Sequence, residues 1–306
     1  MRAVNVRLPF LSTGLMLAVA VAATGAVAGC SGSGSSGSGA AGATAAAASP
    51  LSAVKLAAKT ASGASSFTGT MNLRMTAKPG SAAASGTGML GNVSMSATFA
   101  EQLHPSVLAS VDIGTLQTAG QSLPGGLTEI ITPSTLYLKW SFLTATMHLG
   151  KPWLAIPVSA ADQKSGFNLS QIFSQLQSSG PLTETQLLAG ATNVHQAGTG
   201  TVDGVPVTEY SGTLPLDKGV GYLSGSLKAQ VQKALKAAGI STATFTVWID
   251  GQHLVRKSVV TESGKSVTEV ITTTITSINQ PVNIAIPPAG QTTPMPSSAL
   301  GSGSGV

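Results

Sequence analysis

The chain has 306 residues, and only 9% of them are charged, whereas an ordinary soluble domain has about 25%. One cysteine excludes a disulfide framework and a cysteine-based zinc cluster. The net charge is +5, with 16 basic and 11 acidic side chains. No basic run is present that could neutralise a track of phosphates, so the composition excludes nucleic-acid binding. Both ends are of low complexity, and the part between them is predicted to fold around one core.

Residues 1–29 are predicted to be a secretory signal peptide. Arg2 and Arg7 give a positive start, and an apolar, Ala/Val-rich run follows over residues 8–28. The run ends in Val27-Ala28-Gly29-Cys30, which resembles the bacterial lipobox, where the peptidase cuts before a cysteine that already carries diacylglycerol. An ordinary signal peptide with an incidental cysteine, or an uncleaved anchor, are the alternatives. The lipobox is favoured because the chain's single cysteine falls where the apolar run ends.

Lipidation of Cys30 would place the mature protein at the extracytoplasmic face of the cell membrane. Two or three acyl chains, such as palmitate, hold a protein at a bilayer durably, whereas one chain gives marginal binding. Residues 30–49 are predicted to form a Ser/Gly/Ala-rich tether with an r.m.s. reach of roughly 25 Å. Residues 291–306 are predicted to be a disordered tail, because they are rich in Pro, Gly and Ser.

Residues 50–290 alternate mostly with period two, which is typical of half-buried strands. Two hairpins are predicted, over 193–214 with a turn at Asp203-Gly204 and over 243–261 with a turn at Asp250-Gly251. About nine or more strands joined by short turns predict an antiparallel sheet. The other predicted strands lie over residues 67–76, 89–99, 107–113, 136–142 and 267–278.

Helical spacing occurs in a few segments only. Residues 51–61 form a candidate opening helix with Ser52 as its candidate cap, and residues 227–238 form another that ends at Gly239. Residues 169–176 and 183–189 are predicted to be shorter helices. An antiparallel sheet with helices segregated on one side is an α+β arrangement.

The search for catalytic motifs returns near misses. Gly264-Lys265-Ser266 matches the end of a phosphate-binding loop motif, but a strand is predicted to follow where the motif needs a helix. This segment is therefore interpreted as a hairpin turn. The glycines at 86, 88 and 91 likewise lie in strand alternation and open no helix. No Gly-x-Ser-x-Gly elbow is present. A serine hydrolase is the weakest of the alternatives, and no enzyme activity and no cofactor are predicted.

The histidines and carboxylates are not spaced in the sequence as the ligands of a metal ion or as an acid–base pair would be. His104, His148, His195 and His253 stand alone and are expected at surface or strand positions. Asp203 and Asp250 precede glycines and are interpreted as turn residues. Glu209, Glu262 and Glu269 are predicted to face solvent on strands.

Trp248 breaks the pattern of its strand. Phe245, Val247 and Ile249 on one face suffice for a core, and Trp248 points to the other side. One interpretation is that a curved sheet packs Trp248 under a loop. The other is an apolar cavity between the sheet and the helices, which would favour acyl chains by about 0.8 kcal/mol per buried CH₂. The residues predicted to line it are Trp140, Phe142, Trp153, Leu169, Phe173 and Trp248.

The order of these segments resembles the actinobacterial LppX/LprAFG-type lipoproteins, over roughly Pro50 to Pro288. The motifs that carry the resemblance are Leu136-Tyr137-Leu138-Lys139-Trp140, Gly150-Lys151-Pro152-Trp153, Thr201-Val202-Asp203-Gly204-Val205-Pro206-Val207-Thr208-Glu209-Tyr210, Val247-Trp248-Ile249-Asp250-Gly251 and Ile284-Ala285-Ile286-Pro287-Pro288. The resemblance implies a LolA-like fold, a half-barrel of antiparallel strands that wraps helices and closes over a hydrophobic cavity. It also implies binding of acylated lipids or glycolipids outside the cytoplasmic membrane, and it carries over no catalytic residue. The helical and strand segments here are richer in Ala, Ser, Thr and Gly than the resemblance would suggest.

The hypothesis is therefore a lipid-anchored extracytoplasmic protein that binds a lipid in its cavity and carries or presents it, with a membrane transporter as a further expected partner. The alternative is an envelope sensor or interaction module that uses the same fold to bind a partner protein. A filled interior with an apolar patch outside would favour the alternative.

Overall fold

A computed structural model describes residues 49–61, 63–81, 92–118, 121–122, 126–146, 148–157, 187–221 and 225–295. These residues form one sheet with the strand order β13-β7-β6-β5-β3-β2-β1-β12-β11-β10-β9-β8, and β4 pairs with β3 off this path. The strands are β1 (Ser66–Ala77), β2 (Val93–Gln102), β3 (Leu108–Thr118), β4 (Gln121–Ser122), β5 (Leu127–Ile131), β6 (Thr135–Trp140), β7 (Trp153–Pro157), β8 (Thr192–Val202), β9 (Val205–Pro215), β10 (Thr242–Asp250), β11 (Val255–Ser263), β12 (Val267–Ile278) and β13 (Thr292–Pro294).

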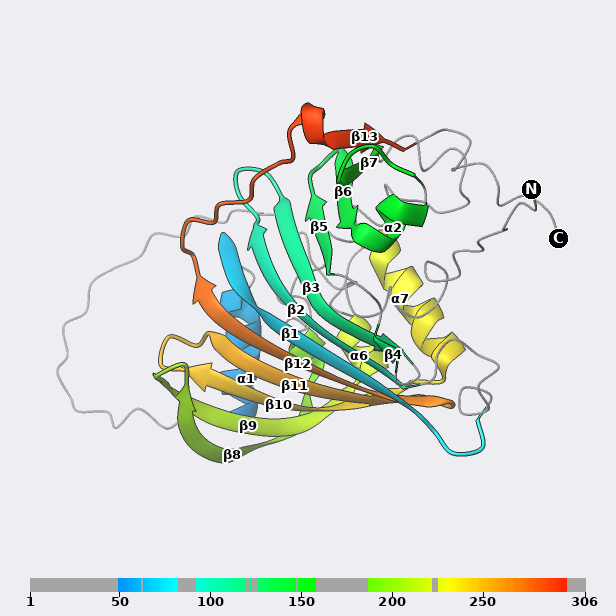
Figure 1. The fold of residues 1–306 in the computed structure, drawn as a ribbon. Coiled ribbons are helices and arrows are strands. Elements are labelled where there is room, and N and C mark those ends of the chain that lie inside the picture. Colours follow the sequence, from blue (N-terminus) through cyan, green and yellow to red (C-terminus); the bar gives the residue numbers. More distant parts are fainter. Residues whose placement is uncertain are drawn as a thin grey trace, which may run out of the picture.

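The sheet bends strongly around the helices α1, α6 and α7, which lie on its concave side (Figure 1). The helical elements are α1 (Pro50–Ala61), α2 (Ser141–Thr146), the 3₁₀ turn η2 (Leu188–Gly190), α6 (Leu216–Val220), α7 (Gly225–Ala238) and the 3₁₀ turn η3 (Ala289–Gln291). Neighbouring strands pair antiparallel, apart from β13 on β7. The predicted α+β half-barrel is therefore confirmed.

The ends of the two long helices follow local chemistry. The backbone N–H of Ser52 donates to Oγ of Ser49 at 3.2 Å, so Ser49 caps α1 and the prediction of Ser52 as the cap is wrong. Pro50 at the first helical position explains the earlier start, because its missing N–H needs no partner there. Helix α7 ends at Ala238, and the next residue, Gly239, has a φ of +68°, which glycine adopts easily. The N–H of Ile240 then donates to the carbonyl of Leu235 at 2.9 Å.

The predicted hairpins form, with one difference in turn length. Val202 pairs with Val205, and Asp203 and Gly204 between them have φ values of +47° and +79°, which fits a two-residue turn. The second hairpin has a longer loop, because the N–H of Asp250 donates to the carbonyl of Leu254 at 3.0 Å. Residues 264–266 form the turn between β11 and β12, as predicted.

Several predicted boundaries shift. Phe142 lies in α2 rather than at the end of the preceding strand. Thr292–Pro294 form β13 within the segment predicted to be a disordered tail, and the N–H of Met295 donates to the carbonyl of Ala155 at 2.8 Å. The pairing with an edge strand supplies order that composition does not reveal. The predicted helix over 169–176 lies outside the described residues.

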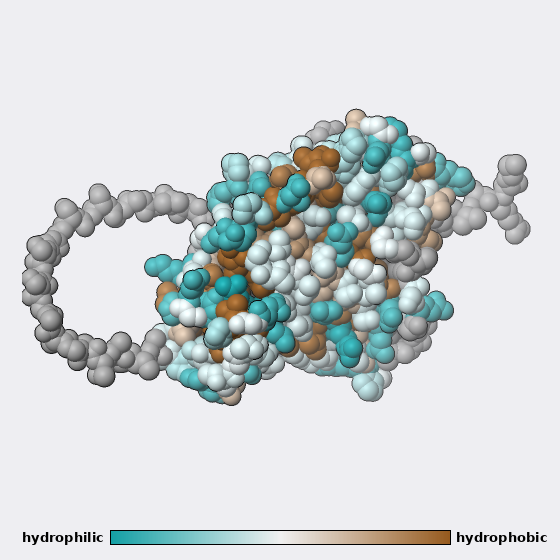
Figure 2. Space-filling view, turned by 60° about the vertical axis from the view of Figure 1, so that its left-hand side comes forward, coloured by the Kyte–Doolittle hydropathy of each residue, from teal (hydrophilic) through white to brown (hydrophobic). Residues whose placement is uncertain are grey.

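The buried residues divide into two large clusters. The helix-covered cluster joins β10 and β11 to α1, η2, α6 and α7, with Val54, Val220 and Val247 fully buried. The sheet-only cluster lies on β1, β2, β3 and β12 and takes in adjoining loop residues such as Ala64, but no residue of a described helix. A smaller cluster gathers Leu154 and Ile156 of β7 with partners that include Trp140. On the face shown in Figure 2, apolar areas alternate with hydrophilic ones and with ones of intermediate hydropathy.

Candidate functional site

The concave face of the sheet-only cluster is a mainly apolar floor. Leu73 in β1 lies between Met95 of β2 and Ile271 of β12, and strand register extends the same face to Ile113 of β3. Because side chains alternate between the faces of a strand, these residues all project to the concave side. The floor therefore consists of strand side chains that no described helix residue joins.

An aromatic ring packs closely over a glycine on this floor. A Cβ atom at Gly69 would lie 2.6 Å from the ring of Phe99, its cross-strand partner. The rings of Phe99 and Phe67 meet edge to face with centroids 6.1 Å apart. The same arrangement recurs in the helix-covered cluster, where a Cβ atom at Gly212 would lie 2.7 Å from the ring of Phe245. Glycine at both positions is thus required by the close approach of a ring.

Four glutamates share the concave face with these apolar residues: Glu101, Glu129, Glu262 and Glu269. Burial raises the pKa of Glu101 to about 8 and that of Glu129 to about 7. Burial also raises the pKa of Glu262, and burial followed by repulsion from Glu262 raises that of Glu269 to about 7. Burial therefore favours the protonated form of the carboxyl groups on this face, most strongly for Glu101.

The prediction that Glu262 and Glu269 face solvent is wrong. They face each other across β11 and β12, and Glu269 is only 4% exposed. Glu269 alternates with Val270 and shares its face with Ile271, so strand parity fixes its direction despite its charge. The parity was readable in the sequence, whereas the usual preference of charged residues for water pointed the other way.

Trp140 is the predicted lining residue that the structure places on the concave face. It pairs with Leu127 and packs against the Leu154 and Ile156 cluster. The ring of Phe142 lies beside it, with centroids 5.0 Å apart. Phe142 is 41% exposed, so this aromatic pair lies at the border of the apolar surface.

Trp153 and Trp248 lie on the outer face of the sheet and not with Trp140. Trp248 alternates with the buried Val247 and Ile249, and Nζ of Lys257 lies 4.7 Å from its ring centroid. Nζ of Lys139 lies 5.8 Å from the ring centroid of Trp153. These cation–π contacts stabilise the tryptophans on the outer face, so both residues leave the predicted lining. Leu169, Phe173 and Cys30 lie outside the described residues.

A groove of about 460 Å³ lies on the outer face over β8 to β11. Its lining includes His195, Thr244 and Thr261, and the hydroxyls of Ser211 and Thr246 lie 3.0 Å apart within it. Its lining mixes hydroxyl groups with apolar side chains such as Val259, and it lies on the opposite face of the sheet from the predicted apolar cavity. That cavity stays a prediction.

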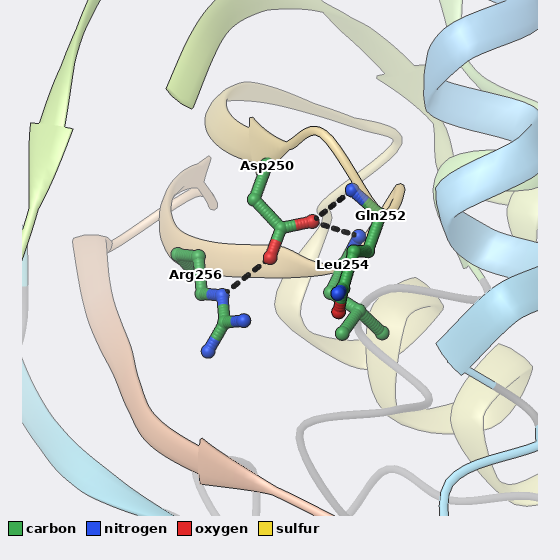
Figure 3. A network of polar contacts seen from close by, with 4 residues as sticks. All are labelled: Asp250, Gln252, Leu254 and Arg256. Atoms are coloured by element: carbon green, nitrogen blue, oxygen red, sulfur yellow. Dashed lines mark hydrogen bonds and ion pairs between the residues drawn. The ribbon is translucent and has the colours of Figure 1, made fainter. Parts of the chain in front are cut away.

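The loop after β10 is held by Asp250, which is a structural residue (Figure 3). Its Oδ1 accepts hydrogen bonds from the N–H groups of Gln252 and Leu254 at 2.8 and 2.9 Å. Its Oδ2 accepts from Nε of Arg256 at 2.7 Å. Asp250 is buried, and these bonds satisfy its carboxylate. They also fix the turn between Ile249 and Val255, which belong to the helix-covered cluster.

The described residues hold no cluster of three or more His, Cys, Asp or Glu side chains that could bind a metal ion. The four histidines are exposed and lie in different parts of the sheet and its loops. None of the helices in the described ranges combines the length and the apolar character needed to cross a membrane.

No protein-family model matches the chain. A stretch of 103 residues is 37% identical to the "Putative phthiocerol dimycocerosate transporter LppX" of Mycobacterium tuberculosis, covering 33% of this chain and 36% of that protein. The predicted resemblance to LppX is confirmed. A stretch of 130 residues is 30% identical to an uncharacterised protein of Streptomyces griseus, covering 41% of this chain and 42% of that protein. The chain thus spans less than half the length of the curated relatives it matches.

Two solved structures of mycobacterial lipoproteins also resemble the chain. That of LppX from M. tuberculosis has a TM-score of 0.43 at 20% identity, over 77% of this chain and 98% of LppX. That of LprF from Mycobacterium bovis has a TM-score of 0.45 at 12% identity, over 78% of this chain and 96% of LprF.

Proposed function

We propose that this protein binds an acylated lipid or glycolipid on the concave face of β1, β2, β3 and β12, and carries or presents it outside the cytoplasmic membrane. The observation that carries the proposal is the sheet-only cluster, an apolar floor without a residue from any described helix. The local similarity to LppX, whose name describes a lipid transporter, supports the same class of ligand.

The mechanism is sequestration. Each CH₂ group that moves from water onto the apolar floor contributes about 0.8 kcal/mol. An acyl chain of ordinary length therefore supplies a large favourable free energy of binding, from which the cost of ordering the lipid is subtracted. Trp140 and Phe142 lie at the border of this surface and are proposed to contact the lipid as it enters. Leu169 and Phe173 remain proposed lining residues.

The anchor is part of the proposal. Diacylglyceryl-modified Cys30 and the tether over residues 30–49 would keep the domain close to the membrane from which it takes the lipid, and so raise the local concentration of ligand. A membrane transporter is the proposed partner for delivery. No catalytic step and no cofactor is proposed.

The ligand can be tested directly by extraction. The full-length chain, purified from membranes, is extracted with organic solvent, and the extract is compared by mass spectrometry with that of a second detergent-purified lipoprotein. A lipid enriched with this chain supports the proposal. Absence of enriched lipid, together with no uptake of a fluorescent acyl probe, contradicts it.

The anchor needs a separate experiment. A Cys30→Ser variant should appear in the culture medium, whereas the unchanged chain should sediment with membranes. A variant that stays with membranes would contradict lipid anchoring and leave the ligand proposal intact.

A further inference from the structure

Strand β12, near the centre of the sheet, carries two deeply buried polar side chains on its concave face. Glu269 and Thr273 are each 4% exposed. They alternate along the strand with outward-facing residues and share their face with Ile271 and Ile275. Both side chains therefore project over the sheet-only cluster.

Within the described chain, these two side chains make no hydrogen bond and no ion pair. The other buried polar side chains do have partners: Ser66, Thr132, Asp250, Ser258 and Thr292. A buried polar group without a partner costs about 1–3 kcal/mol. Two such groups on one strand face are an exception that calls for an explanation.

Glu262 completes the arrangement. It lies directly opposite Glu269 in the register of β11 and β12, and directly opposite residues have Cβ atoms about 5 Å apart. The flanking positions are apolar, with Met75 beside Glu269 on β1 and Ala243 beside Glu262 on β10. Two facing carboxyl groups in such surroundings cannot both ionise easily, so they hold a proton and can donate a hydrogen bond.

We propose that Glu262, Glu269 and Thr273 form a polar subsite that binds the ester or hydroxyl group of an acyl lipid, which places a polar linkage of the ligand inside the fold over β12. This inference rests on the proposed function and makes it more specific. A protonated carboxyl of the Glu262 and Glu269 pair donates to one carbonyl oxygen. Thr273 lies four residues and about 13 Å further along β12, so its hydroxyl donates to a second polar group of the same ligand, whereas a pure hydrocarbon would leave both without a partner. The ligand class is therefore a neutral acyl ester.

The test compares two fluorescent probes of equal chain length on the purified full-length protein: a diacylglycerol ester and an alkane without polar groups. The unchanged protein should bind the ester about tenfold more tightly, which corresponds to about 1.4 kcal/mol. The double change Glu269→Leu and Thr273→Val should remove most of this preference and leave alkane binding equal or stronger. Glu269→Gln should retain the preference, because an amide still donates.

The matched control is Thr272→Val, on the outer face of the same strand. It should leave both affinities unchanged. Equal affinity of the unchanged protein for ester and alkane, or an undiminished preference in the double variant, overturns the subsite and leaves lipid binding standing. Preference for a cationic acyl amine over the ester also overturns it, since ionised carboxylates would then be the ligands. Failure of the unchanged protein to bind either probe contradicts the proposed function itself.

Discussion

The two halves of the concave face are built from similar strands, but they differ in the elements that pack against them. Over β10 and β11, the helices α1, α6 and α7 supply side chains such as Val54 and Val220 that fill the curve. Over β1, β2, β3 and β12, the cluster consists of strand and loop residues only. Both halves place a phenylalanine ring over a cross-strand glycine, so the local design of the floor is the same.

This difference in packing assigns a structural role to one half of the concave face and a proposed binding role to the other. The half over β10 and β11 is filled by its own helices, and its buried carboxylate Asp250 is satisfied by three hydrogen bonds. Only its border with β12 carries a polar side chain of the proposed subsite, Glu262. The other half combines an apolar floor with buried polar groups such as Glu269 that lack partners in the described chain. The first half stabilises the curved sheet, and the second is the proposed surface for the lipid.

The largest effect should come from truncating the matched phenylalanines. Phe245→Ala, in the helix-covered cluster, should lower the free energy of unfolding by about 3–5 kcal/mol, because its surroundings collapse little. Phe99→Ala should cost less, about 1–3 kcal/mol, because fewer elements enclose it. Urea unfolding followed by tryptophan fluorescence measures both.

Lipid uptake should rank the two variants in the opposite order. Phe99→Ala should reduce uptake of an acyl probe several-fold, whereas folded Phe245→Ala protein at low temperature should retain it. Equal losses of uptake would remove the functional contrast between the halves.

Removing the carboxylate of Asp250 should have the next largest effect. Asp250→Ala should lower the free energy of unfolding by about 3 kcal/mol, because it leaves Arg256 and two backbone N–H groups without their acceptor. Asp203→Gly, at the exposed turn of the other hairpin, is the control and should be close to neutral, since glycine tolerates the positive φ there. Chemical unfolding of both variants checks this, and a loss under about 1 kcal/mol at Asp250 would contradict a structural role for the network.

The carboxyl groups of the second half predict how stability depends on pH. Burial raises the pKa of Glu101 to about 8 in the fold, so the folded state holds this proton more tightly than the unfolded chain. The stabilisation that Glu101 contributes is therefore fully present below about pH 4.3, the pKa of a glutamate in the unfolded chain. This contribution is lost as the pH rises toward about 8. The slope should be at most about 1.4 kcal/mol per pH unit for one carboxyl.

Glu101→Gln should reduce the slope of this profile between about pH 5 and 8, with Glu129 and Glu269 supplying the slope that remains. Glu209→Gln on the outer face should leave the slope in place. Thermal unfolding across a pH series measures the profile. A stability that rises with pH over this range would show that the inward-facing carboxyl groups are ionised in the fold.

The smallest effect is expected for the outer tryptophan. Trp248→Ala removes a cation–π contact with Lys257 and should cost about 1 kcal/mol, with lipid uptake unchanged. Trp140→Ala, at the border of the concave face, should reduce uptake instead. Loss of uptake in the Trp248 variant would place the ligand on the outer face.

Strand alternation, turn residues and helix stops in the sequence predict most of the fold. The period-two pattern around Leu73, the turn at Asp203-Gly204 and the stop at Gly239 are local signals, because each depends on backbone geometry within a few residues. The edge strand β13 could not be predicted, since its order comes from pairing with β7, more than a hundred residues away in the chain.

The candidate site was less predictable for the same reason. Hydrophobicity alone grouped Trp140, Trp153 and Trp248 together, but the face on which a strand residue lies depends on parity within its own strand and on what covers that face. Parity within β12 fixes the inward direction of Glu269, whereas its position opposite Glu262 depends on the pairing of β12 with β11.

The amino-acid sequence thus determined the secondary structure and the antiparallel class of the sheet, because these follow from periodicity and turn chemistry over short distances. Only the tertiary structure decided which half of the curve the helices fill, and which glutamates lie buried opposite one another. Those properties depend on contacts between strands far apart in the chain, and no local pattern encodes them.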